Sequence, residues 1–337
     1  MGFLLIDSSD SNMSPIPTSM KAARVSKQGG LEEIQVTDIP VPTPKPDEIL
    51  IKVEWAGVNF IDTYFRGGVY PREVPFTLGQ EAAGTIVALP TASEVVNSDD
   101  YKVRGFKQGA RAVGYFSACF AEYVAIPWKD VQLIPEGLST RVAAASLAQG
   151  LTALTFVKEA YPVKKGDWIL VHAAAGGAGL LFTQLASQLG ANVIGTTSSP
   201  AKAEIAKKAG AAHVINYTET TVSSEVLKLT DGRGVEAIFD GGTIVSYGNA
   251  SGVVPPFSVL KLGAKNVKVC RPVVGNYLTE PSEFHQYSVE LLDLIKNGKL
   301  NIAIHAEYQL TTEGIRQSQI DITGRGTSGK LLVKVAE

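Results

Sequence analysis

The stretch "VHAAAGGAG", from Val171 to Gly179, decides how this chain folds. It follows a short apolar segment, "WILV" (168–171), and precedes a helical pattern, "LLFTQLASQLG" (180–190). A strand, a glycine-rich turn and a helix in this order form the context in which a G-x-G-x-x-G pattern binds a dinucleotide. The order therefore predicts a nucleotide-binding turn in the second half of the chain.

The turn lacks the first glycine of the pattern. Ala174 takes that position, while Gly176 and Gly179 take the second and third. The second glycine lets the backbone approach a pyrophosphate, and the third allows the helix to pack closely. The helix that follows offers free N–H groups and a partial positive charge to phosphates. Turns of small residues also serve simple strand-to-helix packing, so the pattern alone leaves that alternative open.

The end of the next strand indicates which dinucleotide binds. Sites for NAD usually place an acid there, which binds the ribose 2′-hydroxyl. This chain has "IGTTSSPAKAE" (194–204), with Ser198 and Lys202 and no acid before Glu204. Hydroxyl and ammonium groups attract a 2′-phosphate, whereas a carboxylate repels it. We therefore expect NADPH as the cofactor, with the alternative that Lys202 is only a solvated helix residue.

Strands alternate with helical segments of 10–12 residues from about 168 to 239, which indicates a parallel, doubly wound sheet. The earlier part, from about Lys21 to Ala125, is rich in short apolar runs broken by Gly and Pro and predicts a β-rich domain. The last run, "GKLLVKVA" (329–336), predicts a strand that rejoins that domain. Residues 93–105 are polar and predict a surface loop. The fold class is therefore α/β, with the nucleotide domain inserted into the β-rich one.

The domain boundaries follow from this order of strand-rich and alternating segments. We expect residues 1–19 to form a disordered extension, with an ordered cap strand as the alternative. Residues 20–150 and 274–337 should form the β-rich domain, and residues 151–273 the nucleotide domain.

Composition excludes several classes of function. The formal net charge of the 337-residue chain is −2 and no basic block occurs, which speaks against binding to nucleic acid. No apolar run reaches the roughly 18 residues of a membrane span. The only cysteines, Cys119 and Cys270, lie far apart, which argues against a disulfide framework or a cysteine-built zinc site. A reducing, cytoplasmic location is the expectation.

Several segments together resemble zeta-crystallin-type quinone oxidoreductases, zinc-free members of the medium-chain dehydrogenase/reductase superfamily. The resemblance runs from about Met20 to the end of the chain. Its most specific pieces are "GVNFIDTYFRGGVYP" (57–71), "LGQEAAGTI" (78–86), "HAAAGGAGLL" (172–181) and "GKLLV" (329–333). It implies a GroES-like β-rich catalytic domain, an inserted Rossmann domain and a cleft between them. It also implies NADPH-dependent reduction of quinones or α,β-unsaturated carbonyls, and a homodimer.

The resemblance also implies the residues of the site. Asn59 and Tyr64 would donate hydrogen bonds to the oxyanion that develops on the substrate, a contribution of about 100-fold in rate for one such donor. Alternatively, Asn59 caps a turn and Tyr64 only packs. Residues expected to contact the cofactor are Phe60, Thr155, Gly176, Gly177, Ala178, Gly179, Ser198, Lys202, Tyr217, Tyr247, Gly248, Asn249, Arg271 and Lys330. For Tyr217 the alternative is a core tyrosine.

No metal is expected. Zinc-dependent proteins of the superfamily have Cys where this chain has Asn59 and His where it has Gln80. Neither amide is a good ligand for Zn²⁺. The four histidines show no ligand spacing.

One segment departs from the resemblance. The runs "AIFD" and "TIVSYG" are separated only by Gly241-Gly242. Parallel neighbours need a crossover of about a dozen residues, and similar proteins have about 16 more residues here. A Gly-Gly link suits an antiparallel hairpin, so a strand is expected to be lost or reversed, or the region irregular. This shortened form should bind its cofactor more weakly, and a non-catalytic nucleotide-binding protein with a structural or RNA-binding role is the alternative function.

Overall fold

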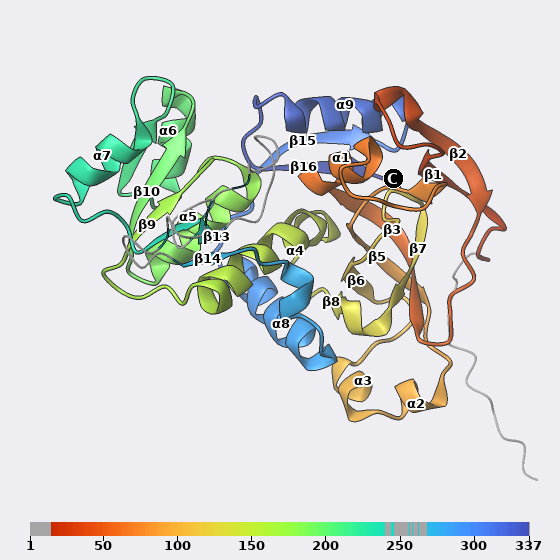
Figure 1. Ribbon diagram of the computed structural model, residues 1–337. Helices are drawn as coiled ribbons and strands as arrows, with labels where there is room; N and C mark the ends of the chain where they lie inside the picture. The colour runs from red at the N-terminus through yellow and green to blue at the C-terminus, as the bar shows by residue number, and fades with distance from the viewer. Residues whose placement is uncertain are drawn as a thin grey trace, which may run out of the picture.

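The computed structural model describes residues 15–239, 244–245, 256, 258, 262 and 268–336. Its chain forms two lobes (Figure 1). One lobe holds the parallel sheet with α6 and α7, and the other holds the mixed sheets with α1 and α9. Helix α4 (Thr140–Thr155) lies between them and packs against elements of both.

The parallel sheet has six strands in the order β11-β10-β9-β12-β13-β14, and every neighbouring pair is parallel. Its first strand in the chain lies in the middle and the order reverses on either side, as in doubly wound nucleotide-binding folds. The strands are β9 (Trp168–Val171), β10 (Asn192–Thr197), β11 (His213–Asn216), β12 (Ala237–Phe239), β13 (Ile244–Val245) and β14 (Val269–Cys270). The expected doubly wound sheet is confirmed.

The expected helical segments of this lobe form, although the first begins three residues before the pattern at 180–190. They are α5 (Gly177–Gln188), α6 (Pro200–Lys208) and α7 (Val222–Leu229). The Ser199 hydroxyl accepts a hydrogen bond from the backbone N–H of Lys202, and Pro200 is the first helical residue of α6. Both features favour a helix start because they satisfy or remove unpaired N–H groups.

The other lobe combines a three-stranded and a seven-stranded sheet. Strand β16 pairs antiparallel with β3, so the last strand rejoins the β-rich domain as expected. The strands are β1 (Ser19–Val25), β2 (Ile34–Pro40), β3 (Glu48–Val58), β4 (Phe76–Thr77), β5 (Glu81–Ala88), β6 (Arg111–Tyr115), β7 (Tyr123–Pro127), β8 (Val131–Leu133), β15 (Ile304–Gln309) and β16 (Lys330–Lys334). Its longer helices are α1 (Phe60–Gly67), α8 (Pro281–Lys296) and α9 (Thr312–Thr323). Short 3₁₀ turns at 31–33, 128–130 and 274–277 belong to the described connections.

Helix α4 joins the lobes. Almost all of its residues are buried, and a π-helical turn, Phe156–Ala160, continues it. Its small side chains, as in "VAAASLAQG" (142–150), let β3, β5 and β6 approach on one side and α5 and α8 on the other. The expected domain boundary between residues 150 and 151 falls inside this continuous helix.

Residues 93–105 lie mostly at the surface, as expected, but they do not form a loop. The segment forms two short helices, α2 (Ser93–Val96) and α3 (Asp99–Arg104). The Ser98 hydroxyl accepts the N–H of Tyr101 and so caps α3. Arg104 is buried over the ring of Trp128, and its guanidinium donates a hydrogen bond to the carbonyl of Val131. Tertiary partners therefore bury a side chain that polarity alone assigns to solvent.

Strand β13 runs parallel to β12 and to β14. A reversed strand, one of the alternatives for this region, is therefore wrong. The strand is only two residues long, and four residues separate it from the end of β12. Four residues are too few for the helical crossover that parallel neighbours normally have. Gly241-Gly242 themselves lie outside the described residues.

Of the expected extension, residues 1–14 lie outside the described part of the chain, and β1 begins already at Ser19.

Candidate active site

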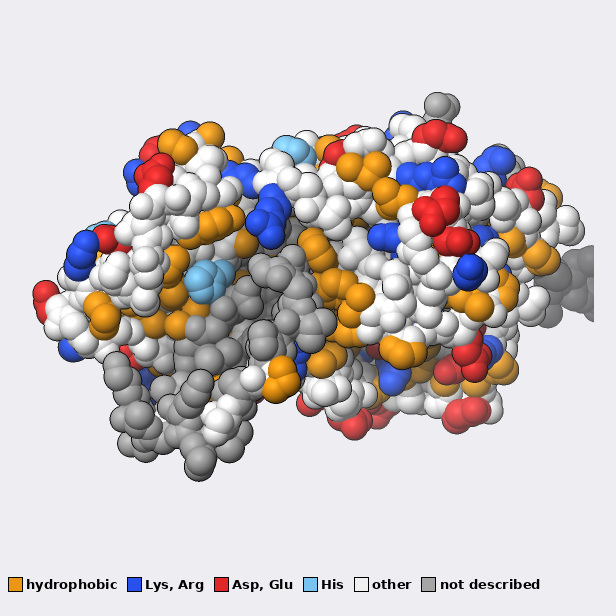
Figure 2. Space-filling view, turned by 45° about the horizontal axis from the view of Figure 1, so that its top comes forward, with side chains coloured by type: hydrophobic (Ala, Val, Ile, Leu, Met, Phe, Trp, Pro, Cys, Tyr) orange, Lys and Arg blue, Asp and Glu red, His pale blue; other side chains and the backbone are white. Residues whose placement is uncertain are grey.

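A cavity of about 630 Å³ lies where the two lobes meet, and residues from both line it. The turn 173–178 and the end of β10 come from the parallel-sheet lobe. The end of β3, the start of α1 and the segment 322–331 come from the other lobe, and Gln149 comes from α4. Figure 2 shows Lys and Arg side chains gathered at this junction. The volume is in the range of a small-molecule or cofactor site.

The glycine turn forms one wall of the cavity. A Cβ atom on Gly179 would lie 2.2 Å from the carbonyl oxygen of Ala173, and one on Gly177 would lie 2.2 Å from Oε1 of Gln149. Gly179 therefore needs glycine because backbone blocks a Cβ, whereas at Gly177 the Gln149 side chain would have to move. Helix α5 begins at Gly177, and the first N–H groups of a helix have no partner within it. These groups, together with the helix dipole, fit a pyrophosphate at this wall.

The loop before β16 lies directly against this turn. A parallel β-bridge joins Gly176 to Gly329, and the Gly329 N–H donates to the carbonyl of Ala175 at 3.2 Å. Lys330, the next residue, is thereby brought to the turn. Segments that lie far apart in the sequence, the glycine turn and the loop before β16, thus form one wall of the cavity.

The charges of the cavity have one sign. Among the described residues that line it are the cations Lys202, Arg325 and Lys330, and none of the lining residues is Asp or Glu. Lys202 Nζ donates to the backbone carbonyl of Arg325 at 2.6 Å, and both residues line the cavity. Such a cavity attracts a ligand with several negative charges.

Many of the expected site residues come together here. Those that line the cavity are Asn59, Phe60, Gly176, Gly177, Ala178, Ser198, Lys202, Tyr217 and Lys330. Tyr217 is 43% exposed, so the alternative of a core tyrosine is wrong. Tyr247, Gly248 and Asn249 lie outside the described residues.

Four expected residues do not line the cavity. Thr155 is fully buried in α4, and its hydroxyl donates to the carbonyl of Leu151, so the helical phase turns it into the core. Arg271 is exposed just after β14. Gly179 is buried beneath the turn and provides room for packing. Tyr64 is one turn along α1, and its ring contacts that of Phe60 with centroids 5.4 Å apart.

The amide of Asn59 is held on every side. Its Nδ2 donates to the carbonyl of Gly57 at 3.1 Å and to Oε1 of Glu81 at 2.9 Å. Its Oδ1 accepts from Lys330 Nζ at 2.7 Å. Because both amide hydrogens bind protein acceptors, a hydrogen bond to a substrate would have to replace one of them. Asn59 is also the residue immediately before α1, where its backbone N–H donates to Asp62, so the alternative of a capping position describes its place in the fold.

A buried carboxyl group lies next to this amide. Asp62 is fully buried, and its Oδ2 accepts the backbone N–H of Asn59 at 2.8 Å. Among the described residues its Oδ1 has no hydrogen-bond partner. Burial raises the pKa of Asp62 from 3.8 to about 7, against a smaller lowering effect of the Asn59 N–H and of Lys330. Asp62 is therefore not a solvated surface residue but a buried partner of Asn59.

This pKa predicts a pH dependence of stability. Between about pH 4 and 7 the unfolded chain ionises at Asp62 while the folded chain keeps the proton, so this group's contribution to stability is lost as pH rises. Asp62→Asn does not titrate, and its amide oxygen can still accept the Asn59 N–H. Its unfolding free energy should therefore rise relative to wild type across this window, by on the order of 1 kcal/mol per pH unit at most, and stay level above it. Chemical denaturation at several pH values measures this difference, and a difference independent of pH would contradict the assignment.

Glu81 and Arg325 lie at the site although the sequence does not indicate either of them as a site residue. Glu81 lies inside the segment "LGQEAAGTI" (78–86), where its only signal is a carboxylate among apolar residues. Arg325 lies between two glycines, in "GRGTSGK" (324–330), and only the fold brings it to Lys202. His172 also lines the cavity, and its Nδ1 lies 3.0 Å from the Thr196 hydroxyl.

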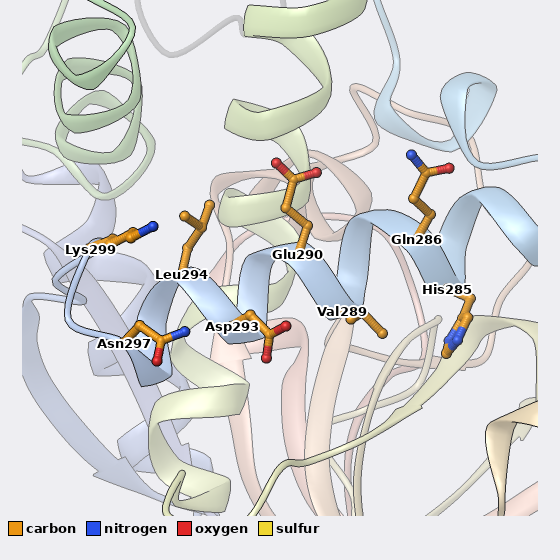
Figure 3. A pocket seen from close by; sticks show the side chains of 8 residues that line it. All are labelled: His285, Gln286, Val289, Glu290, Asp293, Leu294, Asn297 and Lys299. Carbon is orange, nitrogen blue, oxygen red and sulfur yellow. The ribbon is translucent and has the colours of Figure 1, made fainter.

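A second hollow, of about 450 Å³, runs along α8. Figure 3 shows Gln286 and Glu290 on one side of the helix and His285 and Val289 on the other, so these side chains do not converge on a point. Two of its polar groups already have protein partners, since Glu290 pairs with Lys158 at 2.6 Å and His285 Nδ1 lies 2.8 Å from Gln132 Oε1. This hollow lacks the convergent polar groups of a binding site.

No cluster of three or more His, Cys, Asp or Glu that could hold a metal ion occurs in the described part of the chain. Within the same residues no helix is long and apolar enough to cross a membrane.

Known proteins share these features. A family model described as zinc-binding dehydrogenase matches residues 177–241, and one described as alcohol dehydrogenase GroES-like domain matches residues 45–136. A probable quinone oxidoreductase of Schizosaccharomyces pombe is 38% identical over 328 residues, which cover 92% of this chain and 95% of that protein. The GroES-like domain expected from the resemblance is thereby confirmed.

Solved structures agree with the sequence matches. The quinone oxidoreductase of Escherichia coli complexed with NADPH superposes with a TM-score of 0.85 at 32% identity, over 93% of this chain and 99% of that one. A mycobacterial protein complexed with NADPH superposes with a TM-score of 0.87 at 36% identity, over 94% of this chain and 99% of that one. With its doubly wound sheet, its glycine turn and these matches over almost its whole length, the chain belongs to the quinone oxidoreductases of the medium-chain dehydrogenase/reductase superfamily.

Proposed function

We propose that this protein uses NADPH to reduce quinones, and α,β-unsaturated carbonyls, without a metal ion. The observation that carries the proposal is the cavity wall, which combines the glycine turn with Lys202, Arg325 and Lys330 and has no carboxylate among its described residues. NADPH has a pyrophosphate and a 2′-phosphate, so it matches such a wall better than NADH does. When bound, its nicotinamide supplies a hydride.

The protein's own residues then bind and orient the cofactor. The N-terminal N–H groups of α5 and the ammonium of Lys330 hold the pyrophosphate. An ammonium has three donors, and Lys330 uses two of them on Asn59 and Glu81, which leaves one for a phosphate oxygen. Lys202, Arg325 and Ser198 bind the 2′-phosphate. The exposed ring of Tyr217 lies at the same end of the cavity and stacks on the adenine.

The substrate end is formed by α1. Phe60 lines the cavity, the ring of Tyr64 packs against it at a tilt, and the ring of Tyr70 packs edge-to-face on Tyr64. We propose that the Tyr64 hydroxyl donates to the oxygen of the quinone or enone. Asn59, whose amide is fully engaged, orients Lys330 rather than donating freely. A planar, apolar quinone suits these aromatic faces.

Metal independence rests on the residue types at the site. Asn59 and Gln80 are poor ligands for Zn²⁺, and their amides already bond within the protein, Gln80 to the carbonyl of Gly79. Activity should therefore survive prolonged dialysis against a chelator.

The activity is tested by the loss of reduced nicotinamide absorbance with an ortho-quinone and with an enal, each with NADPH and with NADH. We expect turnover that is faster with NADPH. The short β12–β13 connection favours a second candidate, a nucleotide-binding protein without catalysis. Tight NADPH binding with no turnover would support that second candidate and overturn the first.

Lys202→Ala should lower the preference for NADPH over NADH. A hydrogen bond between charged groups contributes about 1.5–3 kcal/mol, so the preference should fall about 10-fold or more. The measurement is the ratio of kcat/KM for the two cofactors. Lys207→Ala in the same helix is the matched control, because Lys207 is exposed and pairs with Glu204. An unchanged ratio in Lys202→Ala would show that this ammonium does not bind the 2′-phosphate.

We further propose a homodimer in the cytoplasm, with no nucleic-acid partner. Strand β14 is last in the order of described strands, and Val269 and Val273 are 38% and 55% exposed there. An open apolar edge strand is a template for pairing with a second chain. Light scattering should give a dimer mass that falls towards the monomer in Val273→Lys. Cys119 and Cys270 are free thiols, which suits a reducing compartment.

A further inference from the structure

Glu81, at the start of β5, is a carboxylate with no exposed surface. Its Oε1 accepts from Lys330 Nζ at 2.6 Å and from Asn59 Nδ2 at 2.9 Å. Its Oε2 accepts the backbone N–H of Ala148 at 2.6 Å. One side chain thus joins β16, the start of α1 and the inter-lobe helix α4.

The backbone around Glu81 leaves room for this carboxylate. A Cβ on Gly57 of β3 would lie 2.2 Å from Oε1 of Glu81 and 2.7 Å from the carbonyl oxygen of Ala144 in α4. Only a glycine fits between the carboxylate and the helix. The same Gly57 offers its carbonyl to the Asn59 amide. The arrangement is therefore a built site and not a chance pairing of surface charges.

Glu81, Asn59 and Lys330 form a closed ring of hydrogen bonds, since Lys330 also donates to Asn59 Oδ1 at 2.7 Å. The carboxylate determines the orientation of the amide. If the Asn59 amide were flipped, its Oδ1 would face the Glu81 carboxylate and its Nδ2 would face the Lys330 ammonium. Both contacts would be repulsive. Asn59 and Lys330 line the cavity, whereas Glu81 does not. Glu81 can therefore act on a ligand only through these two neighbours.

We propose that Glu81 is a positioning residue, which holds the Lys330 ammonium and the Asn59 amide in the cavity wall and fixes that pair to α4. The inference rests on the proposed NADPH-dependent function, and it adds a residue that supports the pyrophosphate contact from behind. Both oxygens of the Glu81 carboxylate accept hydrogen bonds, and an amide has only one oxygen that can do so. In Glu81→Gln an N–H donor must face either the Ala148 N–H or the Asn59 and Lys330 pair.

A double-mutant cycle tests this. The NADPH dissociation constant is measured from nicotinamide fluorescence for wild type, Glu81→Gln, Lys330→Met and the double variant. We expect Glu81→Gln to weaken binding about 10-fold when Lys330 is present, the effect of a lost hydrogen bond to a charged group, and by much less in the Lys330→Met background. Glu81→Asp, which keeps the charge, should recover part of the affinity.

Glu48→Gln removes another buried carboxylate, which bonds to the Lys45 N–H far from the cavity, and should leave the affinity unchanged. If Glu81→Gln lowered the NADPH affinity equally with and without Lys330, the role of Glu81 would be structural only, and the proposed positioning role would be wrong. If Glu81→Gln does not fold, Glu81→Asp with and without Lys330 gives the same comparison. Absence of NADPH binding and turnover in wild type would overturn the proposed function itself.

Discussion

Lys330→Met should lower the free energy of unfolding by about 3–5 kcal/mol, the usual cost of removing one partner from a buried ion pair. The side chains of Lys330 and Glu81 are 3% and 0% exposed, and their charged atoms lie 2.6 Å apart. Methionine fills similar space but leaves the Glu81 carboxylate charged in a dry environment, and it leaves Asn59 Oδ1 without its donor. The stability is lost because the Glu81 carboxylate stays buried without a partner, and not because packing is lost.

Chemical denaturation of the cofactor-free protein measures this change. The double variant Lys330→Met, Glu81→Gln should recover part of the stability, because neither charge remains to be buried. Lys228→Met removes an exposed partner of Glu225 and should change stability by less than about 1 kcal/mol. If Lys330→Met were no more destabilising than Lys228→Met, the pair would not carry the energetic role that its burial implies.

Gly179→Val should abolish useful cofactor binding, with a loss in affinity of about 100-fold or more. The new Cβ would lie 2.2 Å from the Ala173 carbonyl oxygen and 2.9 Å from its carbonyl carbon. Both contacts are with backbone, so no flexible side chain can move aside, and the turn or α5 must shift. A displacement of about 1 Å at a binding element typically costs about 100-fold.

The NADPH dissociation constant and the melting temperature together test this. Binding should be lost while the chain still unfolds cooperatively, since overpacking of this kind costs about 1–3 kcal/mol. Gly275→Ala is the matched control, because a Cβ there would meet nothing within 4 Å. Wild-type affinity in Gly179→Val would mean that the turn does not hold the pyrophosphate.

The local features of the nucleotide lobe could be predicted from the sequence because each depends on neighbours in the chain. The Ser199-Pro200 pair starts α6 through a hydrogen bond three residues away. The alternation of strands and helices and the glycine turn likewise follow from short-range patterns. The location of Lys202 at the cavity also follows, since the end of β10 must lie beside the turn in a doubly wound sheet.

Long-range contacts account for what could not be predicted. Residues 93–105 are polar, yet Arg104 is buried because the carbonyl of Val131 and the ring of Trp128 accept it. Thr155 turns into the core because of its phase on α4. The shift in the Asp62 pKa arises from complete burial, a property that no local pattern contains.

By itself the sequence predicted the doubly wound lobe, the glycine turn before its first helix and NADPH as the cofactor, because helix starts, glycine positions and charge sign act over a few residues. Only the tertiary structure showed that Glu81 and Arg325 belong to the site and how Asn59, Lys202 and Lys330 are held there. Glu81, Asn59 and Lys330 are separated by as many as 271 positions, and Lys202 and Arg325 by 123. The hydrogen bonds of Glu81, Asn59 and Lys330 form only where β3, β5, β16 and α4 meet, and burial there excludes much of the water that would otherwise compete for these polar groups.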